Sequence, residues 1–553
     1  MRCRFVPWTI IAVVVGFPAA AKAASACDPV VVLDAAEFGV KADGVTDDGA
    51  AIGRMLRAAA ATAAPVCLQF PAGHVIRIET APERYVFRFR GASRVTLDGN
   101  GCTFLLAPDL RFLRLNESRD VTIRNLNIDF DPLPFADGMV VAVDADRRFV
   151  DVRLSSPAVR PPLGGPTRED GEQAFFGMLW YDGAYGLVSR HYWTQRIEPG
   201  PDVDTVRVFA DDRFREFDDI KPGGWRISLP VSGIAHRFGP GACLEICDND
   251  TVTIENVELW SAPWFGFHVL RNAGEVVFRR VHIRPKPESG RLTSTWRDGF
   301  HVKGNSGSLL WEDCILLGMN DDAFNLSTHS SRITEILAPT EVVVLQTFPL
   351  NPMPWYEGAT FAAADFDART RIGTARIIEV IEQVTPRTTA GRPAASPVTL
   401  KLDRPIAGLA RGDMVWQPEY ANPEAVLRRC RIEKSCRFQT PVTLESCDVT
   451  AFLWFYGERV EGPFPSRVTI RDCKLRRGRG NLRLTVSFLG RKPGHSGPSA
   501  IHDVVIQENE IWGDFSMIGV DGARLIHNQF REPDASIRVE DCPGIPSDQD
   551  MTR

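Results

Sequence analysis

The stretch VTIENVELWSAPWFGFHVLRNAGEVVFRRV, residues 252–281, decides the fold because it opens and closes on the same short pattern. Its two end blocks, VTIENV at 252 and VVFRRV at 276, alternate apolar and polar residues as a strand with one buried face does. Their first residues lie 24 positions apart, and one coil of a parallel β-helix takes roughly 20–25 residues. The spacing therefore predicts that the blocks are stacked strands of successive coils.

The block recurs along most of the chain, which extends this prediction to a whole solenoid. It begins at residues 95, 121, 252, 276, 309, 425, 442, 468 and 504. From the second block on, its sixth position holds Leu126, Val257, Val281, Cys314, Cys430, Cys447, Cys473 and Asn509. Equivalent positions of successive coils stack about 4.8 Å apart, so this column predicts an interior ladder in which cysteine is a small buried hydrophobe.

Two other cysteine pairs leave room for disulfides. Cys243 with Cys247, and Cys430 with Cys436, are close enough in sequence to pair. An exported protein meets oxidising conditions, but the ladder position of Cys430 favours a reduced thiol.

Two gaps in the period, between the blocks at 121 and 252 and between those at 309 and 425, indicate inserted subdomains. The first gap contains MVVAVDADRRFVDVRL, which is typical of a hairpin around Asp146. An Ala-rich segment after Thr46 or Asp47 as N-cap predicts a helix that covers the open end of the coils.

The predicted fold is therefore all-β: a right-handed parallel β-helix with an N-terminal capping helix and two inserted small β subdomains. We divide the mature chain into the cap and first coils (24–130), an inserted β subdomain (131–235), central coils (236–329), a second, barrel-like insertion (330–422) and C-terminal coils (423–553).

Composition and the N-terminus predict an exported soluble protein. The apolar fraction of 44% and charged fraction of 24% are ordinary, and the net charge of -6 gives no footprint for nucleic acid. Two arginines, apolar residues 8–20 and Ala21-Lys22-Ala23 predict a signal peptide over 1–23 and a secreted or periplasmic protein. An alternative ends the signal before a lipid-bearing Cys27, but Ala stands where such sites usually carry Leu. The apolar run is too short to span a membrane stably, and we expect no integral span.

A cluster of acidic residues marks the candidate site. Asp298 precedes the pair Asp321 and Asp322 by about one coil, which predicts three carboxylates on one side of one rung. A regular strand would bury one of the paired aspartates, so we expect them at a bend, with one pKa raised by the other's charge. Hydrolysis of a glycosidic bond needs a carboxylic acid and a carboxylate. An Asx turn with solvated aspartates is the non-catalytic alternative; the nearby Asn325 and His301 favour catalysis.

These motifs resemble the family 110 glycoside hydrolases, which are right-handed β-helix exo-α-galactosidases acting on α-1,3-linked galactose. The resemblance rests on STWRDGFH at 294–301 and NDDAFN at 320–325, whose separation matches that family without a gap. IDFDPLPFADG at 128–138 and SAPWFGFHV at 261–269 are also similar to family segments. The chain departs from the family at Gly299-Phe300, Asn320 and Leu326-Ser327, which line the expected pocket and put the exact sugar in question.

The resemblance implies roles for the three acids. Asp298 is the implied general acid, and Asp321 and Asp322 the implied general base, in an inverting hydrolysis that removes terminal α-linked galactose. Which of the pair is the principal base stays open. Inversion is associated with carboxyl groups roughly 6.5–9.5 Å apart, whereas directly stacked backbones lie only about 4.8 Å apart, so the side chains must diverge.

The remaining expectations concern binding. The candidate sugar contacts are Trp264, Trp296, Lys303, Asn325, Trp454 and Tyr456. For each tryptophan, core packing is the alternative and is slightly favoured. We read His268 and His301 as hydrogen-bonded scaffold, and we expect no metal and no cofactor, because no His, Cys or carboxylate cluster has metal-site spacing. The expected partner is an oligo- or polysaccharide with terminal galactose; the oligomeric state stays open.

Two rival functions remain. One is another polysaccharide-active β-helix enzyme, either a polygalacturonase-like hydrolase or a lyase that uses Arg297 or Lys303 as base. The other is a glycan-binding solenoid without catalysis.

Overall fold

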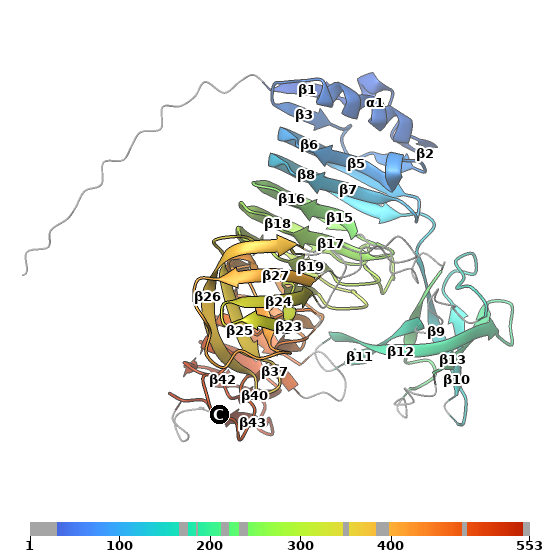
Figure 1. Ribbon diagram of the computed structural model, residues 1–553. Helices are drawn as coiled ribbons and strands as arrows, with labels where there is room; N and C mark the ends of the chain where they lie inside the picture. The colour runs from blue at the N-terminus through green and yellow to red at the C-terminus, as the bar shows by residue number, and fades with distance from the viewer. Residues whose placement is uncertain are drawn as a thin grey trace, which may run out of the picture.

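The computed structural model describes residues 30–146, 148–164, 175–183, 186–211, 220–231, 242–346, 353–382, 397–459, 461–477 and 484–545. Residues 1–23 and Cys27, for which the sequence predicts export signals, lie outside the described residues. Parallel strands stack along the whole length of the coil region, which confirms the predicted β-helix (Figure 1). Within the described residues, no helix has the length and apolarity needed to cross a membrane.

Each coil contributes to two long parallel sheets, which we call sheet A and sheet B. Sheet A contains β1 (Val31–Asp34), β2 (Asp43–Asp47), β3 (Val66–Gln69), β4 (Val75–Ile78), β6 (Ser93–Leu106), β8 (Arg119–Phe130), β16 (Val252–Leu259), β18 (Val276–Ile283), β20 (Ser308–Glu312), β21 (Ile315–Leu316), β29 (Glu424–Arg428), β30 (Arg431–Ile432), β32 (Val442–Glu445), β33 (Asp448–Thr450), β35 (Ser466–Arg471), β36 (Lys474–Arg476), β38 (His502–Gln507), β39 (Glu510–Trp512), β41 (Arg524–Ile526) and β42 (Gln529–Phe530). Sheet B contains β5 (Tyr85–Arg90), β7 (Arg111–Asn116), β15 (Ala242–Cys247), β17 (Phe265–Leu270), β19 (Phe300–Lys303), β22 (Phe324–Ser327), β31 (Cys436–Phe438), β34 (Leu453–Phe455), β37 (Leu484–Leu489), β40 (Asp514–Ile518) and β43 (Ile537–Glu540).

The recurring sequence block forms the strands of sheet A, in the predicted register. Val252 pairs with Val276 and with Val121 in parallel ladders, and Val276 pairs with Leu309. The sixth-position residues thus form one column, the inner ladder, made of Leu126, Val257, Val281, Cys314, Cys430, Cys447, Cys473 and Asn509. All of them are at most 2% exposed.

All ten cysteines in the described part of the chain are free thiols. Cys243, Cys247, Cys430 and Cys436 are among them, so the two possible disulfides are absent. Cys243 and Cys247 lie four residues apart in the single strand β15, so at roughly 3.3 Å per residue they are about 13 Å apart, too far for a disulfide. Burial also raises the pKa of Cys243 to about 12, so its thiol stays protonated.

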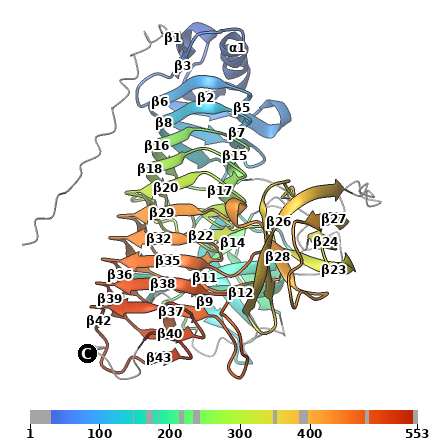
Figure 2. The same ribbon diagram turned by 60° about the vertical axis from the view of Figure 1, so that its left-hand side comes forward.

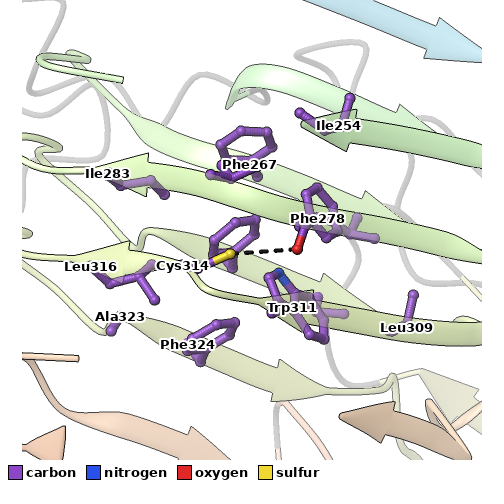
Figure 3. Close-up of a cluster of buried hydrophobic side chains, with 14 of the residues drawn as sticks. Ile254, Phe267, Phe278, Ile283, Leu309, Trp311, Cys314, Leu316, Ala323 and Phe324 are labelled. Carbon is purple, nitrogen blue, oxygen red and sulfur yellow. Dashed lines mark hydrogen bonds between the residues drawn. The ribbon is translucent and has the colours of Figure 1, made fainter. Parts of the chain in front are cut away.

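Aromatic side chains fill the coil interior below the candidate site (Figure 3). Trp311 stacks on Phe278 at 5.4 Å and meets Phe324 edge-on at 5.2 Å between ring centroids. Phe300 and Phe324 stack at 5.2 Å across β19 and β22. This packing fixes the two strands that carry the site on their outer face.

Two closed barrels are inserted in the coils. The first lies between β8 and β15 and contains β9 (Phe135–Val143), β10 (Phe149–Leu154), β11 (Phe175–Gly183), β12 (Gly186–Pro199), β13 (Thr205–Ala210) and β14 (Arg226–Pro230). The second lies between β22 and β29 and contains β23 (Ser331–Ala338), β24 (Glu341–Gln346), β25 (Thr360–Asp365), β26 (Thr370–Glu382), β27 (Pro397–Leu402) and β28 (Met414–Trp416). Both barrels stand beside the stack rather than at its ends (Figures 1 and 2).

The helix α1 (Gly49–Ala60) covers the N-terminal end of the stack, as expected (Figure 2). Its N-cap is Asp48, not Thr46 or Asp47, and Asp48 makes no capping hydrogen bond. The amides of Lys41 and Ala42 donate to the Asp48 carboxylate instead, so this residue ties the helix to the preceding turn.

The turns between the sheets define two corners. We call the turns from sheet A to sheet B the first corner, and the turns from sheet B to sheet A the second corner. At the second corner the buried Asn249, Asn272, Asn305 and Asn422 are joined by amide hydrogen bonds of 2.8–3.1 Å between successive coils. The first barrel leaves from the first corner and the second barrel from the second, so they flank the outer face of sheet B.

Candidate active site

Asp298, Asp321 and Asp322 meet at the first corner, just before β19 and β22. Phe300 pairs with Phe324, and the Gly299 amide donates to the Asp322 carbonyl at 2.9 Å, so Asp298 and Asp322 occupy equivalent places on adjacent rungs. The coil offset is therefore 24 residues, one more than the separation between Asp298 and Asp321. One oxygen from each of the three carboxylates lies within 4.8 Å of the others.

Asp321 and Asp322 lie in a bend that precedes β22, as expected. The bend lets the two carboxylates find different partners. Arg297 donates to Oδ2 of Asp321 at 3.1 Å, whereas Ser435 donates to Oδ1 of Asp322 at 2.9 Å. Arg437 also lies 3.1 Å from Oδ2 of Asp322, as an ion pair without the alignment of a hydrogen bond.

These surroundings separate the protonation states of the acids. Burial, together with the charge of Asp321, raises the pKa of Asp298 well above its usual range. Burial also raises the pKa of Asp322 to about 7, despite the opposing charge of Arg437. Burial acts in the same direction on Asp321, but the cations around it, first among them Arg297, outweigh it and lower the pKa to about 2. At neutral pH the site therefore holds a protonated acid beside an ionised carboxylate.

A row of polar side chains points outward from sheet B beside the acids. We call it the outer row; its members pair in register from rung to rung and are Glu245, His268, His301, Asn325, Arg437 and Trp454. Side chains alternate between the two faces of a strand, so the residue two positions after each member of the outer row also points outward. Lys303, in this second position on β19, is only 2% exposed.

The turn after β34 covers this row with two carboxylates. Arg437 donates to Glu461 at 2.6 Å and to Glu458 at 3.3 Å. Asn325 donates to Glu461 at 3.0 Å. Burial opposes ionisation of Glu461, but the charge of Lys303 leads the cations that lower its pKa to about 2. The carboxylate is thus a fixed anion above the outer row.

The structure gathers four of the six expected sugar contacts at this row. Asn325 and Lys303 are buried in it, and Tyr456 reaches Glu458 through a 3.5 Å hydroxyl contact. The Trp454 side chain is 39% exposed, with its ring edge-on to Tyr456 at 5.2 Å. Its accessible surface at the end of the row suits stacking on a sugar.

The two other tryptophans pack inside the protein, which agrees with the core-packing alternative rather than with a role as sugar contacts. Trp296 is 2% exposed and lies in an apolar cluster with Phe135 of β9, so it joins the first barrel to the coils. Trp264 is 7% exposed, and its ring lies under Arg111 at 5.1 Å. In both cases neighbouring side chains cover the ring that a sugar would need.

The first barrel also reaches the rung below the acids. Lys434 occupies the position of Asp322 in the next coil, and its Nζ donates to Ser189 of β12 at 2.6 Å. His191, two residues further along β12, contributes positive charge that lowers the pKa of Asp321. The barrel is therefore part of the wall of the site.

Sequence reasoning missed Arg437, Glu458 and Glu461. Arg437 stands one residue after Cys436, in the outward position that corresponds to Asn325, and this correspondence was available from the repeat. Glu458 and Glu461 follow β34, outside the repeating strands, where no periodicity predicts the direction of a side chain.

Among the described residues, the three aspartates form a group that is close enough to bind a cation. Arg297 and Arg437 already neutralise Asp321 and Asp322. This donor set is better matched to proton transfer than to a metal, because two of its three members are engaged by arginine.

The curated proteins to which the chain is similar share the name α-1,3-galactosidase. No family model matches the chain. α-1,3-Galactosidase B of Bacteroides thetaiotaomicron is 26% identical over 265 residues, which cover 45% of this chain and 40% of that protein. α-1,3-Galactosidase A of Shewanella woodyi is 25% identical over 43% of this chain and 39% of its own length. α-1,3-Galactosidase A of Bacteroides fragilis (strain ATCC 25285) is 22% identical over 81% of this chain and 71% of its own.

The first two alignments thus span about two fifths of those curated relatives, and the third spans 71% of its relative. Among solved structures, the family 28 exopolygalacturonase of Yersinia enterocolitica aligns with a TM-score of 0.32 and 8% identity, over 93% of this chain and 78% of that one. The β-helix assignment rests on the strand register described above.

Proposed function

We propose that this protein is an exo-acting glycoside hydrolase that removes terminal α-linked galactose, in α-1,3 linkage, from glycans. The observation that carries the proposal is the group of three carboxylates on adjacent rungs, in which Asp298 favours the protonated state and Asp321 the ionised state. Kinship with proteins named α-1,3-galactosidase supports the choice of sugar and linkage.

In the proposed mechanism Asp298 donates its proton to the glycosidic oxygen as the bond to the anomeric carbon breaks. Asp322 takes a proton from the attacking water, whose oxygen forms the new bond to that carbon. A pKa of about 7 makes Asp322 a better base near neutral pH than Asp321. Asp321, held ionised by Arg297, stabilises the positive charge that develops on the sugar ring.

We propose inversion as the stereochemical course. The nearest carboxyl oxygens lie within 4.8 Å, closer than the roughly 6.5–9.5 Å typical of inverting enzymes. Inversion therefore requires the sugar and a water molecule to separate Asp298 from the Asp321–Asp322 pair. In a retaining course the nearer carboxylate would instead attack the sugar directly, and the product anomer distinguishes the two.

The charges around the site favour a neutral sugar over a uronic acid, which weighs against the polygalacturonase-like rival. In the described part of the site, Arg297 and Arg437 are already paired with carboxylates. Glu458 and Glu461 add further negative charge, so the carboxylate of a uronic acid would meet repulsion. The same pairing leaves Arg297 poorly suited to act as the base of a lyase.

The test incubates the full chain with aryl α- and β-glycosides and with α-1,3-galactosyl oligosaccharides, and follows the first-formed product anomer by NMR. Release of galactose from the α-galactosides alone, first as the β anomer, is the expected result. An unsaturated product that absorbs ultraviolet light and disappears with chelator would identify a lyase. Binding without turnover of any glycoside would identify a glycan-binding solenoid.

A further inference from the structure

His301, on the outer face of β19, contacts the proposed general acid directly. Its Nδ1 lies 2.7 Å from Oδ2 of Asp298. The two side chains are only 12% and 5% exposed, so water competes little for this hydrogen bond. The carboxyl group of Asp298 therefore has one oxygen held by the protein.

The imidazole ring itself is held from the neighbouring rung. Phe265 packs against it at 4.9 Å between ring centroids, and His268 at 5.4 Å. Burial, reinforced by the charge of Lys303, lowers the pKa of His301 to about 3, so the ring is neutral at physiological pH. A neutral imidazole carries one N–H, and the partner of each nitrogen decides which one bears it.

We propose that His301 is a positioning residue for Asp298 in the hydrolysis proposed above: its Nδ1–H donates to Oδ2, which leaves the acidic proton on Oδ1. Oδ2 then cannot be the protonated oxygen, and rotation of the carboxyl group would break the hydrogen bond. His301 thus selects which oxygen of Asp298 protonates the leaving group, although it does not touch the sugar itself.

Two variants of the full chain separate this role from simple packing. In His301→Asn the side-chain amide takes about the place of Nδ1 and keeps the hydrogen bond. In His301→Gln the amide takes about the place of Nε2, and the bond is lost. Each variant is assayed on 2,4-dinitrophenyl α-galactoside, whose leaving group needs little protonation, and on an α-1,3-galactosyl disaccharide, whose leaving group needs a general acid.

For His301→Gln we expect kcat on the disaccharide to fall about 10²–10³-fold, within the usual contribution of general acid catalysis, and kcat on the dinitrophenyl substrate to stay within about tenfold of wild type. His301→Asn should stay within about tenfold on both substrates, again judged against that contribution. Equal losses on both substrates, or equal behaviour of the two variants, would overturn this inference and leave the proposed function intact. A wild-type protein that hydrolyses neither substrate overturns the proposed function and this inference with it.

Discussion

The inner ladder of sheet A and the outer row of sheet B run along the same coils, and each takes one residue from every coil. The inner ladder packs the interior, whereas the outer row carries polar groups beside the candidate site. The inner ladder repeats small apolar residues, with cysteine in four of its positions. From Glu245 to Trp454 the outer row changes residue type at every step but one, the step from His268 to His301. Repetition gives each coil the same packing environment, whereas variation along the row places different functional groups next to one another. We therefore expect substitutions in the interior to change stability and substitutions around the row to change chemistry.

The largest effect is expected at the acids beside the outer row. Asp298→Asn removes the proton that the leaving group needs, and kcat on a disaccharide should fall by about 10³-fold or more. The free energy of unfolding should change by less than about 1 kcal/mol, because a protonated Asp298 is already neutral and an amide keeps the contact with His301. Initial rates and urea denaturation, measured on the same preparation, test both parts.

Asp298→Ala serves as the matched control, because it removes the hydrogen bond as well as the proton. Equal activity of wild type and Asp298→Asn on the disaccharide would contradict the assignment of the general acid.

The interior should give the opposite result. Trp311→Ala empties a large, fully buried position under β19 and β22 and should lower the free energy of unfolding by about 3–5 kcal/mol. Well below the unfolding transition, kcat should stay within about tenfold of wild type, since the outer face keeps its side chains. Trp311→Phe, which leaves a smaller void, is the control. A loss of activity without a loss of stability would show that the interior and the row are not separable in this way.

The same contrast explains how much of this molecule could be predicted from its sequence. The coil register could be predicted because the repeat reports it directly: the blocks at 252 and 276 pair in the structure as their spacing indicates. The three aspartates could be gathered for the same reason, since one coil separates Asp298 from Asp322. Prediction succeeds wherever a residue's place follows from periodicity.

The remaining features depend on contacts that no period encodes. The sequence left Trp296 open between a sugar contact and a core residue, and only the contact of its ring with Phe135 of the first barrel decides for the core. Glu461 lies outside the repeating strands, so its place in the site can be recognised only from its contacts with Asn325 and Arg437. Closeness in sequence left two disulfides open, and the structure has free thiols at all four positions; the reduced Cys430 agrees with its predicted place in the inner ladder.

A moderate effect is expected on the pH dependence. Because Asp322 must be ionised to accept a proton, kcat/KM should rise as pH increases through about 7, the pKa of Asp322, and fall again where Asp298 loses its proton. Arg437→Gln removes a cation that lowers the pKa of both acids, so both limbs should move to higher pH, by about one unit or more.

Arg437→Lys retains the positive charge and should show the smaller displacement of the two variants. If the limbs of Arg437→Gln coincide with those of wild type, the ion pair with Asp322 has no part in tuning the base. The interior offers a further reference, because Trp311→Phe should leave both limbs in place.

The smallest effect is expected at the far end of the outer row, where Trp454 is 39% exposed. A pair of aromatic rings contributes about 0.5–1.5 kcal/mol. If a sugar stacked on Trp454 contributes a comparable amount, Trp454→Ala should raise KM by about 2–10-fold while kcat changes little. Trp454→Phe keeps a ring and should recover most of the affinity. The effect should be larger for an oligosaccharide than for an aryl galactoside, because only the longer substrate extends from the acids along the row. An equal rise for both would place the contact with Trp454 on the galactose itself rather than on the rest of the oligosaccharide.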